Sequence, residues 1–261
     1  MVEVKHKVFF NGVVYALQTE DNYPVEVTDT FLPFYTKDAI GQKQNILTEN
    51  DVSDRSERWM IGVSCMSGCP VRCKFCATGK LKKWRNLSAS EIVEQVDFVL
   101  SMNADWDFLN AKEHKINYTR MGEPFLNIEE VRKAIQIIEA RFPGTHHYVS
   151  TIGINGSDFS WIKDNVTLQV SVHSFDVDRR NWLIPFQNKL SYDDLGKIRT
   201  ESSNKTTVNL SLMEEKDFDI EKLRYFFDPK HFFIKLSPIN SNSCSEFFKM
   251  GTGAVQGVNL L

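Results

Sequence analysis

Short runs rich in β-branched and aromatic residues alternate with amphipathic stretches of helical period from about Trp59 onward. The predicted strands cover residues 60–65, 115–120, 147–151, 167–173, 207–213 and 232–238. The predicted helices cover residues 89–102, 128–141, 158–164, 178–183, 193–201 and 220–227. Such alternation is typical of a parallel sheet with right-handed helical crossovers. We therefore predict an α/β fold whose sheet curls into a partial (β/α)6 barrel.

Two of the predicted helices begin at residues that commonly cap helices. Ser88 stands three residues before Glu91, which is the spacing of a capping box. Asn127 precedes a first turn that carries Glu129 and Glu130. We expect the side chains of Ser88 and Asn127 to cap these helices.

The amino-terminal residues contain a hairpin signal instead of the strand–helix alternation. Asn11 and Gly12 form an Asn-Gly turn between apolar runs. We expect residues 1–58 to be an extension that packs on the barrel edge and residues 59–240 to form the barrel. Residues 241–261 then remain as a short carboxyl-terminal tail.

Charge and hydropathy argue against several classes of protein. The formal net charge of −3 does not suit a protein whose main role is to grip nucleic-acid backbone. The first 18 residues lack the uninterrupted apolar core of a signal peptide, and no apolar run is long enough to span a bilayer. We expect a cytoplasmic protein without membrane contact, in a compartment where clustered cysteines bind metal more often than they form disulfides.

Polar residues lie at or just beyond the end of each predicted barrel strand. In chain order they are Cys69, Cys73 and Cys76; Gly122 and Glu123; Ser150 and Thr151; Ser171 and His173; Glu214 and Glu215; and Asn240. The C-terminal ends of the strands form the active-site face of such barrels. We therefore expect these residues to contribute to one shared site.

Three of these residues are cysteines within a segment of eight. Closely spaced thiolates suit an iron–sulfur cluster or zinc. A [4Fe–4S] cluster normally uses four cysteines, so three local ligands leave one iron open to the amino and carboxylate groups of S-adenosylmethionine (SAM). Three alternatives remain: a zinc site, a closed cluster with Cys65 as fourth ligand, and a redox pair of Cys73 and Cys76. We expect Cys65 to be a small buried residue at the end of the first strand.

The segments around these cysteines resemble a known family. They are residues 68–80 with the Cys-x3-Cys-x2-Cys spacing, residues 85–96, Met-Gly-Glu-Pro at 121–124, Ser-Thr-Ile-Gly at 150–153, residues 171–185, and Pro-Ile-Asn at 238–240. In this order, over about two-thirds of the chain, they are similar to the radical SAM superfamily and, in detail, to its RlmN/Cfr group of adenine methyltransferases.

The resemblance implies cofactors and the residues that hold them. A [4Fe–4S] cluster would be bound by Cys69, Cys73 and Cys76, and SAM would be the second cofactor. The residues implied for SAM are Gly122, Glu123, Ser150, Ser171, Val172, His173 and Asn240. Glu123 suits the ammonium group of SAM because a carboxylate accepts charge-assisted hydrogen bonds. A one-electron donor such as flavodoxin or ferredoxin is implied as a partner.

The chain departs from the RlmN/Cfr pattern at the residues that carry methyl transfer. That group uses two further cysteines, and Gly62 stands at the position of the resolving one. Only 261 − 240 = 21 residues follow Asn240, among them Cys244, which is outside the family's register. About 60 residues precede the core, so we expect no helical RNA-binding extension. Arg120 replaces a glycine and is able to clamp a carboxylate or phosphate, or to pair with a neighbouring acidic group.

These departures favour a radical SAM enzyme that acts on an unidentified substrate, which is a small molecule, a peptide or RNA. An RNA adenine methyltransferase that uses Cys244 or Cys65 is the first alternative, and a non-catalytic iron–sulfur or zinc module is the second. The candidates for catalysis or substrate contact are Arg120, Glu214, Glu215, Cys244, Trp84 and Tyr118.

Overall fold

The computed structural model describes residues 1–33, 53–211 and 213–237. The chain forms two compact units, each built from several segments. The first contains Met1–Ser67, Asn86–Met121 and Asn127–Tyr148, and the second contains Gly68–Arg85, Gly122–Leu126 and the chain from Val149 onward. No helix among the described residues combines the length and the apolar character that a membrane crossing requires.

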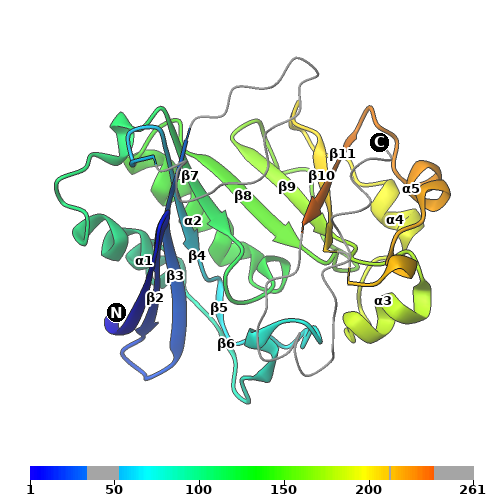
Figure 1. Ribbon diagram of the computed structural model, residues 1–261, viewed down its shortest axis with the longest axis horizontal. Helices are drawn as coiled ribbons and strands as arrows, with labels where there is room; N and C mark the ends of the chain where they lie inside the picture. The colour runs from blue at the N-terminus through cyan, green and yellow to red at the C-terminus, as the bar shows by residue number, and fades with distance from the viewer. Residues whose placement is uncertain (34–52, 212, 238–261) are drawn as a thin grey trace. The chain divides into compact units, whose positions relative to one another are not determined.

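The first unit begins with an antiparallel run of strands (Figure 1). Its strands are β1 (Val2–Phe9), β2 (Gly12–Gln18), β3 (Pro24–Leu32), β4 (Arg58–Val63) and β7 (Glu113–Tyr118). Each of the first three strands pairs antiparallel with the next, and β7 pairs parallel with β4. The predicted hairpin is confirmed, and its strands meet at Phe9 and Gly12. A side chain at Gly12 would overlap the backbone carbonyl of Asp29 on β3.

Two helices cover one face of these strands. Helices α1 (Ala89–Ser101) and α2 (Ile128–Arg141) pack against each other, and α1 also contacts β3 and β4. Ile61 and Val63 are fully buried, and Trp59 on the same face donates from Nε1 to Asp29 at 2.8 Å. Burial of each such apolar side chain contributes about 1.5–3 kcal/mol. Since side chains alternate along a strand, Gly62 lies on the opposite face of β4.

The two predicted caps have different outcomes. The capping box is confirmed: the hydroxyl of Ser88 accepts from the N–H of Glu91, and the N–H of Ser88 donates to the Glu91 carboxylate at 2.8 Å. Asn127 is the N-cap residue of α2, with Glu129 and Glu130 in the first turn as predicted, but its side chain makes no capping hydrogen bond. Its amide instead donates to the backbone carbonyls of Cys65 and Leu87 at 2.8 and 2.7 Å. These buried carbonyls need donors, and Asn127 supplies both.

The second unit contains a parallel sheet with short helices. Its strands are β9 (Val166–Ser171), β10 (Thr206–Ser211) and β11 (Phe232–Ser237), and both pairings are parallel. Its helices are α3 (Val177–Leu183), α4 (Tyr192–Gly196) and α5 (Ile220–Phe226). Strand β8 (His146–Thr151) contributes residues to both units.

The remaining elements are short. They are β5 (Met66–Ser67), β6 (Arg85–Asn86), and four 3-10 turns, η1 (Ala77–Lys80), η2 (Phe108–Asn110), η3 (Pro124–Leu126) and η4 (Glu215–Asp217). Strands β5 and β6 pair as a separate two-stranded sheet, and residues 68–84 lie between them in the chain.

The predicted α/β fold class is confirmed, and each of the six predicted strands overlaps an observed strand. One predicted helix is wrong: residues 158–164 form turns without a helix. Asp158 accepts from the backbone of Ser160, and Phe159 and Trp161 pack their rings against Phe125. Phe159 and Trp161 are two residues apart, so in a helix their rings would point to different sides. In the turn, both rings reach Phe125. Helix α4 is also shorter than predicted and ends at Gly196, where a side chain would overlap the backbone of Phe226.

Candidate functional site

The three cysteines of the triad lie in a loop of the second unit whose conformation depends on unusual backbone angles. Gly68, just before Cys69, has φ +71°, and a Cβ there would come within 2.5 Å of the Lys83 carbonyl oxygen. Arg72, just before Cys73, is a non-glycine residue with φ +56°. Conformations with positive φ are uncommon for such residues and persist only where surrounding contacts fix them.

Contacts on both sides hold this loop in place. The N–H of Lys74 donates to the carbonyl of Leu183 at the end of α3, at 2.9 Å. Gly79 in η1 packs so closely that a Cβ would come within 3.0 Å of the Arg72 Cα. The N–H of Cys76 donates to the carbonyl of Cys73 at 3.1 Å. The cysteine loop is therefore a fixed part of the second unit.

The thiols of the triad are partly buried and influence one another electrostatically. Burial raises the pKa of Cys69 to about 12, against the opposing effect of the Val71 N–H, which donates to its sulfur. Burial also raises the pKa of Cys73 well above its ordinary value, and the neighbouring Cys76 and Cys69 raise it further. Sulfurs held together by backbone donors suit an iron–sulfur cluster, whose positive irons favour the thiolate form.

Among the described residues, no group of three or more cysteine, histidine, aspartate or glutamate side chains is arranged around a single ion.

Glu123 places a buried carboxylate in the same unit. Gly122 before it has φ +106°, a conformation that glycine adopts readily. The two carboxylate oxygens accept hydrogen bonds from the backbone N–H groups of Phe125 and Ile152 at 3.1 and 3.0 Å. Burial raises the pKa of Glu123 to about 7, although these donors and the Thr151 hydroxyl favour the charged form. Its charge also raises the pKa of Cys69, so Glu123 and the cysteine loop share one environment.

The segment that ends β8 supports Glu123. Thr151 donates to Glu123 from its side chain, and its hydroxyl accepts from the N–H of Gly153 at 3.0 Å. The hydroxyl of Ser150 donates to Gln169 on β9 at 3.3 Å. The position of Thr151 at a strand end predicted its place in the site, and the structure gives it the role of a donor to Glu123.

His173 lies beyond the end of β9 and against the cysteine loop. Its ring meets Phe75 edge-on, with the ring centroids 4.8 Å apart. Nδ1 accepts from the N–H of Ser211 at 3.0 Å, which assigns the ring proton to Nε2. Burial, together with the Arg180 guanidinium, lowers the pKa of His173 to about 4, so the ring is neutral near pH 7.

Ser171 and Val172 complete this segment. Ser171 stands opposite Asn209 in the β9–β10 register, and the N–H of Val172 donates to the Asn209 carbonyl at 3.0 Å. The loops after β9 and β10 are thus tied together directly at the strand ends. The structure brings Gly122, Glu123, Ser150, Ser171, Val172 and His173 together with the three cysteines in the second unit. Asn240 and Cys244 lie outside the described residues.

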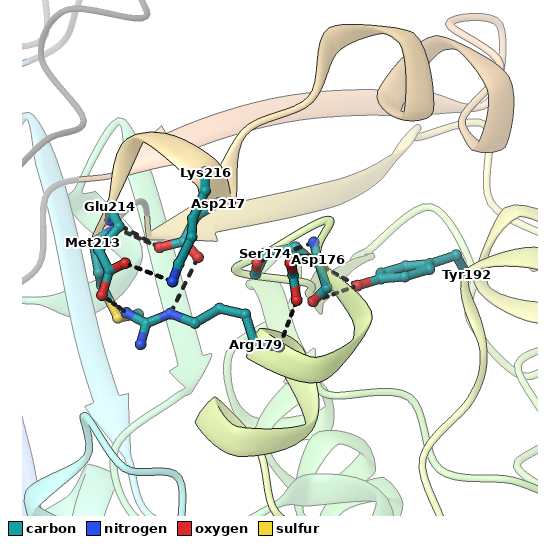
Figure 2. Close-up of polar contacts among 8 residues, drawn as sticks. All are labelled: Ser174, Asp176, Arg179, Tyr192, Met213, Glu214, Lys216 and Asp217. Carbon is teal, nitrogen blue, oxygen red and sulfur yellow. Dashed lines mark hydrogen bonds and ion pairs between the residues drawn. The ribbon is translucent and has the colours of Figure 1, made fainter.

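A second polar cluster joins the loop after β9 to the loop after β10 (Figure 2). Buried Asp217 accepts from the N–H groups of Met213 and Glu214 at 3.2 and 2.8 Å, and from Arg179 Nε at 3.3 Å. Arg179 also pairs with Glu214 at 2.8 Å. Arg179 and Asp217 were not identified from the sequence, since an Arg and an Asp 38 residues apart carry no spacing signal.

The same cluster extends to the start of α3. Asp176 accepts from the N–H of Arg179 at 2.7 Å and caps this helix. The hydroxyl of Tyr192 donates to the Ser174 carbonyl at 2.8 Å (Figure 2). Lys216 pairs with the outer side of Glu214 at 3.1 Å. The predicted candidate Glu214 is therefore held between two cations, and Glu215 is exposed.

The other candidates for substrate contact occupy varied environments. Tyr118 is buried, and its hydroxyl lies 3.3 Å from Nδ1 of His147. Trp84 is about half exposed. Arg120 pairs with Glu26 in the first unit. Pairing with a neighbouring acidic group is one of the two roles predicted for Arg120. Cys65 is buried as expected, and its sulfur lies 3.5 Å from the carbonyl oxygen of Met121.

Three partly buried thiols in one loop are a donor set that suits a metal cluster, and the buried Glu123 carboxylate belongs to the same unit. Residues 63–223 match the Radical SAM superfamily. The chain therefore belongs to the radical SAM superfamily, and the matched residues include the whole cysteine triad.

Individual relatives are RNA methyltransferases by name. A probable dual-specificity RNA methyltransferase RlmN of Chlorobium phaeobacteroides is 32% identical over 200 residues, which cover 69% of this chain and 53% of that protein. The dual-specificity RNA methyltransferase RlmN of Helicobacter hepaticus is 38% identical over 146 residues, which cover 54% of this chain and 39% of that protein. The predicted resemblance to the RlmN/Cfr group is confirmed, and the chain spans about half the length of the first of these relatives.

A solved structure shows the same fold. The crystal structure of a radical SAM methyltransferase from Sphaerobacter thermophilus aligns with a TM-score of 0.70 and 23% sequence identity. The alignment covers 99% of this chain and 72% of that chain. This likeness confirms the radical SAM type of α/β fold.

Proposed function

We propose that this protein is a radical SAM enzyme that cleaves SAM reductively to a 5′-deoxyadenosyl radical, which acts on a bound substrate. Superfamily membership supports this proposal, and so does the arrangement of the second unit. The observation that carries it is the meeting of the cysteine loop with two strand ends, through Cys69 with Glu123 and Phe75 with His173. A site for a cluster and an adjacent site for SAM require this arrangement.

The residues present fit a [4Fe–4S] cluster. Cys69, Cys73 and Cys76 would hold it, because all three belong to one loop fixed by backbone hydrogen bonds. A backbone N–H group donates to the Cys69 sulfur, as is common around such clusters. When bound, a [4Fe–4S] cluster supplies the electron that breaks the sulfonium C–S bond of SAM.

The chain's other residues would bind and orient SAM. The Glu123 carboxylate, which its hydrogen bonds fix in place, would bind the ammonium group. Gly122 would let the backbone approach the cofactor closely. Ser150, Ser171, Val172, His173 and Asn240 would line the ribose, carboxylate and adenine of SAM, and neutral His173 would offer its Nε2–H as a donor. A flavodoxin or ferredoxin in the cytoplasm would provide the electron.

Anaerobic reconstitution tests the cluster and the cleavage together. We expect about four irons and four sulfides per chain, a spectrum that SAM perturbs, and formation of 5′-deoxyadenosine on reduction. Cys73→Ala should lose both the cluster and the cleavage. The matched control is Cys65→Ala, which removes a buried thiol engaged with Met121 and should keep both. Loss of the cluster in Cys65→Ala would contradict the three-ligand assignment and favour a closed four-cysteine cluster.

The names of the relatives favour RNA adenine methylation as a second candidate function. This function needs a thiol that accepts a methyl group from SAM. Cys65 is a poor acceptor because it is buried and lies against the Met121 carbonyl. Cys244 is the remaining candidate. Peptide mass spectrometry after incubation with methyl-labelled SAM distinguishes the two functions: a labelled Cys244 supports methyl transfer, and cleavage without a labelled cysteine supports the first proposal.

A further inference from the structure

The side chain of Arg120 passes over strand β4 in the first unit. Arg120 follows β7, which pairs with β4, and its Nε donates at 2.9 Å to Glu26 on β3, the strand on the other side of β4. A second guanidinium nitrogen donates to the same oxygen of Glu26. The ion pair therefore spans three strands.

Gly62 provides the space for this crossing. A Cβ at Gly62 would overlap the Thr28 hydroxyl and lie 3.1 Å from Arg120 Cδ and 3.3 Å from its Cγ. Any side chain at position 62 would thus displace the aliphatic part of Arg120. Gly62 and Arg120 fit one another as a pair, with the arginine stem lying where a side chain of β4 would otherwise project.

The Arg120 guanidinium has more N–H donors than its contact with Glu26 uses. Both of its hydrogen bonds go to one carboxylate oxygen, although a guanidinium carries five N–H donors. Within the described part of the chain no other group accepts a hydrogen bond from Arg120, and about a third of its side chain is exposed. Glu26 thus fixes one edge of the guanidinium and leaves the other edge able to bind two anionic oxygens.

We propose that Arg120 is a substrate-binding residue that recognises an anionic group, a phosphate or a carboxylate, with Glu26 and Gly62 positioning its guanidinium. The proposal deepens the proposed function and rests on it for the identity of this ligand as substrate. Arg120 directly follows the parallel strand β7 and stands two residues before Gly122 in the chain. The carboxyl end of a parallel strand is where α/β enzymes bind their ligands.

Titration with inorganic phosphate and, separately, with acetate tests the binding site without SAM. The readout is the NMR resonance of the Arg120 Nε–H group. We expect one or both anions to shift this resonance saturably, and the stronger anion to identify the substrate group. Arg120→Gln should weaken binding of that anion by about tenfold or more, because a charge-assisted hydrogen bond is lost. The matched control is Arg141→Gln, which removes another partly exposed arginine paired with an acid, Asp97.

Two further variants separate positioning from charge. Gly62→Ala keeps every charge but displaces the Arg120 stem, so we expect it to weaken anion binding. Glu26→Gln keeps an acceptor that positions the guanidinium but removes the competing negative charge, so it should tighten anion binding. Equal anion affinity in wild type and Arg120→Gln, or an Arg120 resonance that neither anion moves, would overturn the proposal. Failure of SAM to bind the wild type would instead contradict the proposed function, since the anion titration contains no SAM.

Discussion

One carboxylate oxygen of Glu123 accepts a hydrogen bond of 3.0 Å from the backbone N–H of Ile152. This bond joins the segment after β7 to the segment after β8 within the second unit. The other oxygen is held by the N–H of Phe125 at 3.1 Å. A buried carboxylate fixed in this way is oriented before any ligand arrives, so little ordering of its side chain is needed on binding.

The first prediction concerns the affinity for SAM. Glu123→Gln keeps the shape of the side chain but removes its charge, so a charge-assisted hydrogen bond to an ammonium group is lost. We expect SAM affinity to fall by about tenfold or more, corresponding to about 1.5–3 kcal/mol. Calorimetric titration of the reconstituted protein measures this change. Glu129→Gln, at an exposed position of α2, is the control and should bind SAM as the wild type does.

The sequence made Glu123 and its neighbours predictable because they follow strands in a fixed order. Strand ends, the cysteine spacing and the Met-Gly-Glu-Pro segment are all local features. The supporting residues are different. Asp217 meets Arg179 across 38 positions, and Asn127 meets Cys65 across 62. Such partners are determined by how the strands pair, and no spacing in the sequence encodes them. The turn at residues 158–164 was missed for the same reason, because its aromatic side chains pack on distant Phe125.

The second prediction concerns the backbone of the cysteine loop. Gly68 and Gly156 both have positive φ, +71° and +81°. An alanine at Gly156 would meet no atom within 4 Å, whereas an alanine at Gly68 would come within 2.5 Å of the Lys83 carbonyl oxygen and 2.9 Å of Trp84 Cβ. In both variants, an alanine at positive φ destabilises the folded protein by roughly 1 kcal/mol. Gly68→Ala must also displace the loop that carries Cys69.

Iron content after reconstitution and the midpoint of urea unfolding test this prediction. Gly156→Ala should load iron fully and lose little stability. Gly68→Ala should load clearly less iron under the same conditions. Equal loading of the two variants would show that the Gly68 conformation does not determine the position of the cysteines.

The third prediction concerns the cluster around Asp217. Asp217→Asn removes the negative charge that faces Arg179 and replaces one of the two acceptor oxygens with an NH2 donor, so either Arg179 or the N–H groups of Met213 and Glu214 lose their acceptor. Since Asp217 is fully buried, we expect the free energy of unfolding to fall by about 3 kcal/mol. Glu214→Gln removes the other, largely exposed carboxylate that pairs with Arg179 and should cost less than about 1 kcal/mol. Urea unfolding of both variants gives the comparison, and equal losses would contradict the assignment of Asp217 as the main partner.

The last prediction concerns the pH dependence of stability and rests on His147 in the first unit. His147 is fully buried: Nδ1 lies 3.3 Å from the Tyr118 hydroxyl, and Nε2 lies 3.7 Å from Glu139, too far for a hydrogen bond. Burial, together with the nearby His146 and His114, lowers the pKa of His147 from 6.5 to about 3. The unfolded chain therefore binds a proton between pH 6.5 and 3 that the folded protein does not, so acid favours unfolding. His147 should account for about 2 kcal/mol of the stability lost between pH 7 and pH 5.

Urea unfolding over this pH range tests the prediction. The free energy of unfolding of His147→Gln should fall less than that of the wild type by this amount, whatever the stability of the variant at pH 7. Parallel pH profiles for wild type and His147→Gln would contradict the prediction.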